Sequence, residues 1–129
     1  MSESCNIHIK ENKNDTQYIT IYKHQNGSFA GVGKQLKNKF KSYKIVNGIS
    51  EETPKQIANG IGCFAAQVVT FLKTKVGDVY LIPSNNIGTE EHEYILYVKD
   101  NKINIVASSS ESSENLEIMY DGPLANFMA

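Results

Sequence analysis

The first part of the chain alternates apolar and polar residues with the period of a β-strand. Residues 5–11 alternate through the apolar Cys5, Ile7 and Ile9, and residues 18–24 alternate through Ile19 and Ile21. The turn-forming run Asn12–Asp15 separates the two segments. This pattern predicts an antiparallel hairpin of two half-buried strands.

Two later stretches follow the period of an α-helix. The first runs from Phe29 to Tyr43, follows a turn whose Asn26 or Ser28 can cap a helix, and carries lysines on its outer faces. The second starts at the helix-start signal Thr53-Pro54 and keeps a core stripe up to Val76. The sides of this helix outside that stripe are also small or apolar, at Ala58, Gly62, Ala66 and Val69. A helix covered on two sides is central to a fold or lies at a subunit contact.

The remaining apolar runs predict strands at residues 79–82, 94–99, 102–107 and 116–120, whereas residues 46–49 are expected to form a loop. Asp100-Asn101 fits the tight turn of a hairpin. The sequence therefore predicts a single α+β domain over residues 1–129. We expect an antiparallel sheet with two helices, in the order ββααββββ.

The Asp100-Asn101 turn fixes the register of the second hairpin, because it pairs Tyr97 with Asn104. One face then carries core residues, namely Tyr94, Leu96, Val98, Ile103 and Ile105. The other face carries Ile95, Tyr97, Asn104 and Val106 and is too apolar for water, so it should meet a second subunit or a ligand. The Tyr97 ring beside the Asn104 amide suits an adenine, through stacking and hydrogen bonding. Ordinary cross-strand contacts at a dimer seam are the alternative.

Composition narrows the classes of protein. Of the 129 residues, 40% are hydrophobic and 21% charged, as in globular domains, and no apolar run reaches the roughly 20 residues that span a bilayer. Two cysteines and no secretory leader indicate a cytosol-like compartment. All thirteen basic residues are lysine, so bidentate arginine contacts to phosphate are not available. Residues 16–50 hold six lysines and no acid, and such a basic segment attracts anionic ligands or is a solvated helix face.

The segment Gly27–Lys34 is the first candidate site. It departs from a nucleoside-triphosphate loop, because Ser28 replaces the first glycine and Gln35 follows the lysine. Its glycines and the helix start could still cradle a phosphate. Close packing of helix on sheet explains the glycines equally well. The predicted ligand-binding residues, from this segment, its preceding turn and the second hairpin, are His24, Asn26, Gly27, Gly33, Lys34, Tyr97 and Asn104.

Catalytic patterns are sparse. His8, His24 and His92 fall in separate elements, without metal-ligand spacing, so no metal ion or other cofactor is expected. Cys63 has apolar neighbours and reads as a buried, inert thiol. The adjacent Glu90 and Glu91 read as solvated charges. We therefore expect that the protein is not an enzyme.

Three segments together resemble a known family: residues 22–34 around Tyr22-Lys23-His24-Gln25-Asn26-Gly27, residues 59–67 (NGIGCFAAQ) and residues 79–83 (VYLIP). These resemble small phage proteins with a Tyr-x-His-x-Asp-Gly turn, identified as anti-Thoeris sponge proteins (Tad family, first class). Such proteins sequester the cyclic ADP-ribose signal made by bacterial TIR enzymes. The similarity spans about residues 17–127. This chain departs from the pattern at Asn26, where aspartate is expected, and at Gln25, where an aromatic residue is common.

The resemblance implies an oligomer built on dimers, ligand sites between subunits and no turnover. The expected function is non-catalytic sequestration of a cyclic ADP-ribose-type or cyclic oligonucleotide immune signal, as a homo-oligomer in the cytoplasm of the infected bacterial host. One alternative is a phage protein that binds and inhibits a host protein. A small nucleic-acid-binding module is the other, disfavoured by the absence of arginine and a sequence pI near 6.3.

Overall fold

The computed structural model describes residues 3–15, 19–48, 56–83, 90–110 and 115–128. The strands are β1 (Cys5–Ile9), β2 (Ile19–Lys23), β3 (Lys44–Val46), β4 (Ile57–Asn59), β5 (Val79–Ile82), β6 (His92–Lys99), β7 (Lys102–Ser109) and β8 (Glu117–Pro123). The helical elements are the π-helical turn η1 (Phe29–Gly33), α1 (Lys34–Phe40), α2 (Gly60–Leu72) and the 3-10 turn η2 (Leu124–Asn126). The chain is thus α+β with two α-helices among these residues, as predicted.

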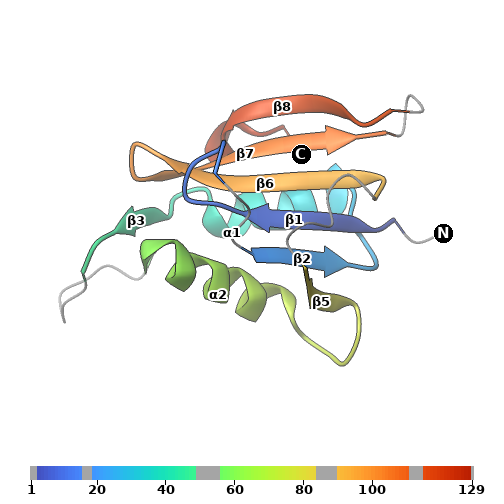
Figure 1. Cartoon of the computed structure of the whole chain (residues 1–129), viewed down its shortest axis with the longest axis horizontal. Helices are drawn as coiled ribbons and strands as arrows, with labels where there is room; N and C mark the ends of the chain where they lie inside the picture. The colour runs from blue at the N-terminus through green and yellow to red at the C-terminus, as the bar shows by residue number, and fades with distance from the viewer. Residues whose placement is uncertain (1–2, 16–18, 49–55, 84–89, 111–114, 129) are drawn as a thin grey trace.

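The eight described strands form one curled, mixed sheet (Figure 1). Its order is β4-β3-β7-β6-β1-β2-β5, and β8 pairs with the edge of β7. The prediction of a purely antiparallel sheet is wrong, because β1 pairs in parallel with β6 and β3 in parallel with β4. The β1–β6 pairing joins segments separated by several other elements, and β3 and β4 are only three residues long, so neither pairing leaves a mark in the local pattern.

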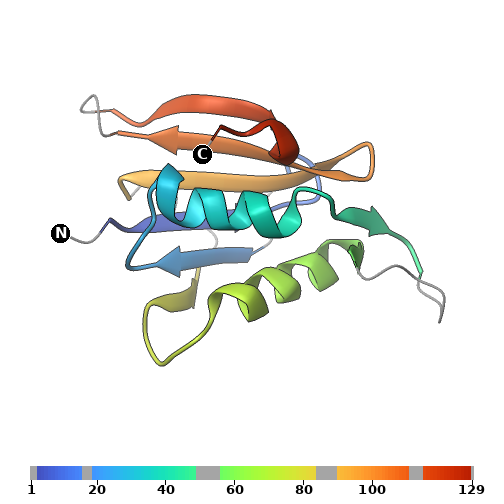
Figure 2. The ribbon, with the colours of Figure 1, turned by 180° about the vertical axis from the view of Figure 1, so that it is seen from behind.

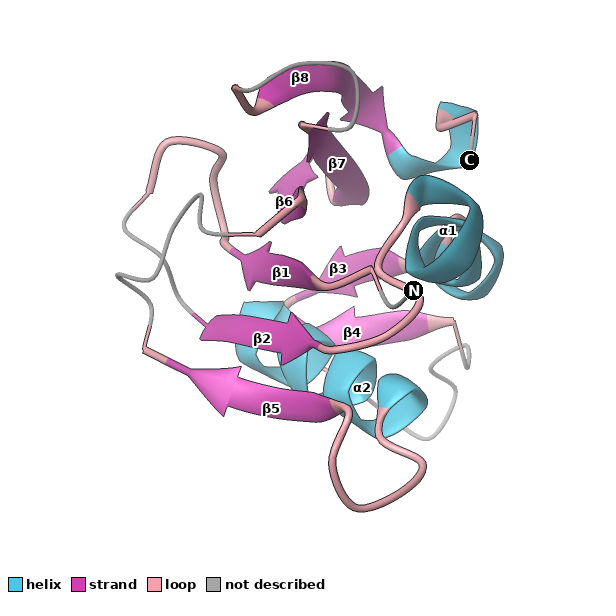
Figure 3. Cartoon of the chain, turned by 90° about the vertical axis from the view of Figure 1, so that its right-hand side faces the viewer, coloured by secondary structure: helices cyan, strands magenta, loops and turns pink. Residues whose placement is uncertain are grey.

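The helices lie on one side of the sheet (Figure 2). Seen along the sheet in Figure 3, α1 packs against the side opposite the β1–β2 connection. Phe40 of α1 joins the two helices, because its ring meets Phe64 and Phe71 of α2 edge to face, with centroids 5.2 and 5.6 Å apart. No helix among the described residues has the length and apolar character needed to cross a membrane.

The predicted order ββααββββ is also wrong, since two short strands lie between the helices. β3 occupies part of the expected loop, and β4 occupies residues expected to be helical. Gly60 then turns the chain with φ +82°, so α2 begins there. The predicted start at Thr53 lies outside the described residues. The helix ends at Leu72, which leaves the supposed core residue Val76 99% exposed.

The first predicted helix is divided in two. The π-helical turn η1 precedes α1, and the Ser28 hydroxyl accepts a hydrogen bond from Gly31 N at 3.1 Å. Of the two predicted capping residues, Ser28 is therefore the one that caps this turn. α1 ends at Phe40, and Tyr43 lies beyond it but remains buried.

The second hairpin confirms its predicted register. Tyr97 lies opposite Asn104, and the turn residues Asp100 and Asn101 have φ of 55° and 61°. Such positive φ values at both central residues belong to the turn that matches strand twist. β5 has its predicted bounds, and the other predicted strands agree to within three residues at each end.

The outer face of the sheet, opposite the helices, is buried more fully than the alternation predicted. All five residues of β1 are buried, including Asn6 and His8 on the outer face, so this strand is not half-buried. Tyr97 and Asn104 are also buried, at 7% and 4% exposure, and Ile95 is half-buried. These values hold for a single chain, so the side chains of this face are buried without a second subunit.

Candidate functional site

Three lysines stand side by side across neighbouring strands. Lys99 of β6 lies opposite Lys102 of β7, and Lys44 of β3 lies opposite Lys102 on its other side. We call Lys44, Lys102 and Lys99 the lysine row. Residues directly opposite in a ladder point to the same face with Cβ atoms about 5 Å apart, and like charges placed so repel. An anion bound across the row would remove that repulsion.

A cavity of about 500 Å³ opens at one end of this row. We call it the lysine cavity. Its lining residues are Lys13, Tyr97, Lys99, Asp100, Lys102, Asn104, Asp121, Gly122 and Pro123. They come from the β1–β2 connection, the β6–β7 hairpin and the end of β8, of which the first two lie at the same end of the sheet in Figure 1. The volume is that of a site for a small organic ligand.

A second hollow of about 460 Å³ adjoins the lysine cavity and shares Lys102 and Pro123 with it. Lys41 and Lys44 line this hollow from the segment that follows α1. Positive side chains therefore border both hollows, and Lys102 stands between them. This arrangement joins the basic segment seen in the sequence to the hairpin.

Asp121 organises one wall of the lysine cavity. The Tyr97 hydroxyl donates to its Oδ1 at 2.7 Å, and the Lys13 ammonium donates to its Oδ2 at 2.6 Å. The hydrogen bond from Lys13 is the main reason that the pKa of Asp121 is lowered. Burial, together with the bond to Asp121, raises the pKa of Tyr97 to about 12. At neutral pH this wall therefore holds an ionised carboxylate and a protonated phenol.

The cations of the lysine cavity differ in their partners. Lys13 is paired with Asp121. Among the described residues, no carboxylate forms an ion pair with Lys99 or Lys102. These two ammonium groups are therefore the positive charges with which a phosphate could pair.

Tyr97 and Asn104 come together as predicted, but not as an open stacking surface. The Tyr97 ring belongs to a side chain that is 7% exposed, and its hydroxyl is engaged by Asp121. The Asn104 amide donates to the carbonyl oxygen of Lys102 at 3.2 Å. Both residues line the lysine cavity, but the burial of Tyr97 does not support stacking of an adenine on its ring.

The predicted glycine cradle packs against protein instead. A Cβ on Gly27 would lie 2.7 Å from the backbone of Ser4, and Gly27 N already donates to the Glu3 carbonyl at 2.7 Å. A Cβ on Gly33 would lie 3.2 Å from the Phe127 ring. Both glycines are buried, which supports close packing as the reason for them.

The other three predicted residues are exposed. His24 Nδ1 lies 2.8 Å from the Tyr22 hydroxyl. Asn26 has φ 58° and lines a separate cavity of about 340 Å³ that also includes Lys23 and Lys75. Lys34 is the first residue of α1. None of these three lines the lysine cavity.

A buried polar network was missed by the sequence analysis. His8 Nδ1 lies 3.0 Å from the Thr20 hydroxyl, His8 Nε2 lies 2.7 Å from Glu93 Oε1, and the Asn6 amide donates to Glu93 Oε2 at 3.0 Å. The polar positions of β1, two apart, are the signal that could have placed Asn6 and His8 on one face. Hydroxyl, imidazole and carboxylate stand in the order used by hydrolases. Thr20 and His8 are each 1% exposed, however, so this hydroxyl does not face a substrate.

Comparison with known proteins gives no further information on the site. The chain matches no protein-family description, and neither the curated proteins nor the solved structures include a match.

Proposed function

We propose that the protein binds a small phosphate-bearing nucleotide at the lysine row and holds it without chemical change. The observation that carries this proposal is the cross-strand arrangement of Lys44, Lys102 and Lys99 beside a cavity of about 500 Å³. Three like charges in one row cost stability unless an anion joins them. The ligand class is the cyclic ADP-ribose type or a cyclic oligonucleotide, in keeping with the resemblance to anti-Thoeris sponges.

The phosphate groups of the ligand and its base or ribose would make two different kinds of contact. Phosphate oxygens would pair with Lys99 and Lys102, in charge-assisted hydrogen bonds. A base or ribose would occupy the wall around Asp121, whose carboxylate accepts from hydroxyl and amino groups. The second hollow, beyond Lys102, leaves room for a compact ligand with more than one phosphate.

The ionisable groups of the wall support binding rather than turnover. Asp121 is kept ionised by Lys13, and Tyr97 keeps its proton up to a pKa of about 12. A general acid or base works best with a pKa near the working pH. Neither group meets that condition, which is why we propose a sponge and not an enzyme.

A second copy of the chain would complete the site. Strand β8 forms a sheet edge, exposes Ile118 at 67% and Met119 at 54%, and ends at the lysine cavity. Pairing of two copies along this edge would cover the apolar side chains and close the cavity against water. As a sponge, this homo-oligomer of at least two chains would act in the cytoplasm of an infected bacterium.

Calorimetry with the full chain tests the proposal. The panel is cyclic ADP-ribose isomers and cyclic oligonucleotides, with a random single-stranded RNA as the rival ligand. Lys102→Gln should weaken nucleotide binding at least tenfold, because it removes the central charge of the row. Lys34→Gln is the matched control and should leave binding within twofold.

The chemical state of the recovered ligand distinguishes a sponge from an enzyme, and RNA binding distinguishes it from a nucleic-acid-binding module. Chromatography after heat denaturation should return the nucleotide intact. A cleaved product would make the protein an enzyme, and salt-sensitive binding of the RNA alone would make it a nucleic-acid-binding module. Absence of binding across the nucleotide panel, or equal binding by the Lys102→Gln variant, would refute the proposed site.

A further inference from the structure

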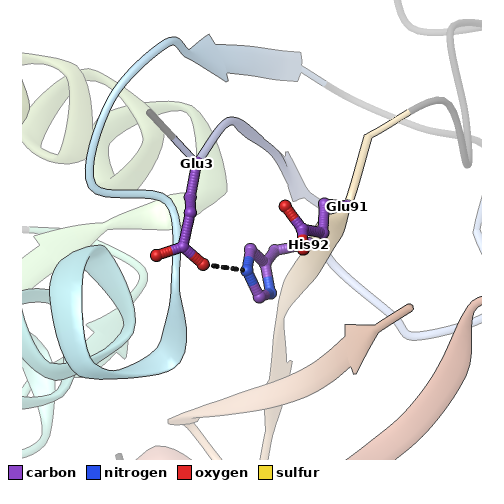
Figure 4. A group of neighbouring side chains, drawn as sticks. All are labelled: Glu3, Glu91 and His92. Carbon is purple, nitrogen blue, oxygen red and sulfur yellow. Dashed lines mark hydrogen bonds and ion pairs between the residues drawn. The ribbon is translucent and has the colours of Figure 1, made fainter. Parts of the chain in front are cut away.

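Two carboxylates and an imidazole meet at the end of the sheet where β6 begins (Figure 4). Glu3, Glu91 and His92 each offer one ligand atom, and these atoms all lie within 4.8 Å of one another. His92 Nε2 and Glu3 Oε2 are 3.0 Å apart. Glu3 precedes β1, whereas His92 is the first residue of β6, so the parallel β1–β6 pairing brings them together.

The backbone at each carboxylate is held in place. Gly27 N donates to the Glu3 carbonyl at 2.7 Å, and Ser110 N donates to the Glu91 carbonyl at 3.0 Å. The main chains that carry the two carboxylates are therefore fixed beside His92.

The imidazole is buried more deeply than the carboxylates. His92 is 1% exposed, and the Phe29 ring lies against it with centroids 5.6 Å apart. By contrast, Glu91 is exposed and Glu3 is partly exposed. The group thus combines a fixed nitrogen donor with two oxygen donors that open toward water.

We propose that Glu3, Glu91 and His92 form a binding site for a divalent transition-metal ion, with Zn²⁺ as the best fit. Neutral imidazole and carboxylate are ordinary zinc ligands, at about 2.0–2.2 Å from the metal. Ligand atoms of a tetrahedral site lie about 3.3–3.6 Å apart at those bond lengths. The pair His92 Nε2 and Glu3 Oε2, at 3.0 Å, already lies close to that spacing.

The donor set discriminates between metals. Mg²⁺ and Ca²⁺ take oxygen ligands, whereas an imidazole nitrogen favours zinc and its neighbours. Three protein ligands leave a fourth position for water. The ion would tie the segment before β1 to the start of β6, in place of the present contact between His92 and Glu3.

Zinc titration of the full chain by calorimetry, with excess Mg²⁺ present, tests the site. The wild-type protein should bind one Zn²⁺ per chain, and Zn²⁺ should raise its melting temperature. Glu91→Gln should weaken zinc binding at least tenfold, and this exposed change leaves the buried contacts of the fold in place. His92→Gln should do the same, and its circular dichroism reports whether it folds.

Two exposed residues elsewhere provide matched controls: His24→Gln and Glu117→Gln should bind Zn²⁺ within twofold of wild type. Wild-type protein that takes up no Zn²⁺ at millimolar concentration would overturn the site. So would a Glu91→Gln variant that binds as wild type, or a His24→Gln variant that loses binding equally. This test uses no nucleotide, so its outcome is independent of the proposed sponge function.

Discussion

Replacing Lys102 by glutamine is expected to stabilise the protein without ligand. Lys102 stands between Lys99 and Lys44, so one substitution removes two repulsive contacts. A cross-strand pair of side chains contributes about 0.2–1 kcal/mol, unfavourably for like charges. Two unit charges about 6 Å apart in water repel by about 0.7 kcal/mol, which agrees with that range. The gain in free energy of unfolding should therefore be about 0.5–2 kcal/mol.

Thermal melting at low ionic strength measures this gain. For a chain of this size, about 1 kcal/mol corresponds to a shift in Tm of roughly 3–6 °C. The shift should shrink as salt is raised, because the screening length falls from about 30 Å at 0.01 M to about 3 Å at 1 M. Lys34→Gln makes the same chemical change outside the row and should move stability by less than about 0.5 kcal/mol.

Two results would refute the reasoning. If Lys102→Gln melts at or below the wild-type temperature at low salt, the row is not under repulsion. If its gain persists unchanged at 1 M salt, the gain is not electrostatic. The proposed function requires that stability and affinity change in opposite directions: Lys102→Gln should be more stable than the wild type and should bind nucleotide more weakly.

Three further outcomes follow from the described contacts. Gly27→Ala and Gly33→Ala should each lower the free energy of unfolding, measured by chemical denaturation, by about 1–3 kcal/mol. Gly27→Ala should have the larger effect, because its new Cβ meets rigid backbone, whereas the Cβ at position 33 meets an aromatic ring. A larger effect of Gly33→Ala would contradict this account of the packing. The pKa of Asp121 is lower in the folded than in the unfolded chain, so its stabilisation is present above about pH 3.9 and is lost as pH falls through the folded value. Asp121→Asn should accordingly flatten the fall of Tm below about pH 4, and an unchanged acid profile would count against that bond. Cys63 is only half-buried, so the expectation of a buried thiol there is wrong. Iodoacetamide should therefore modify Cys63 in the folded protein but Cys5 only after unfolding, because Cys5 is fully buried and burial raises the pKa of its thiol. Mass spectrometry that finds native Cys5 labelled would contradict this.

Local signals determined the register of the second hairpin, although its two strands extend two residues further than predicted. The Asp100-Asn101 turn and the alternation around it were sufficient to place Tyr97 opposite Asn104. The same register already places Lys99 opposite Lys102, so two members of the lysine row were within reach of the sequence. Lys44 was not, because it joins the row through β3, a three-residue strand whose pairing with β7 is not local.

The errors share one physical cause. Residues 57–59 continue a helical apolar pattern, yet they form β4 because β3 offers them a parallel partner. Tertiary pairing overrides a weak local preference in such short segments. Likewise, polar residues on β1 predicted a solvated face, but neighbours distant in the chain bury Asn6 and His8 and supply their hydrogen bonds.

The parallel pairing of β1 with β6 also sets the order of events during synthesis. The first strand leaves the ribosome with only β2 as an available partner, and its other edge stays open until residues 92–96 have been made. An isolated two-stranded hairpin is marginally stable in water. The sheet therefore cannot close around β1 before residues 92–96 have been made, and the long loop that this pairing closes slows folding. Until then, the edge of β1 is a place where nascent chains could join one another.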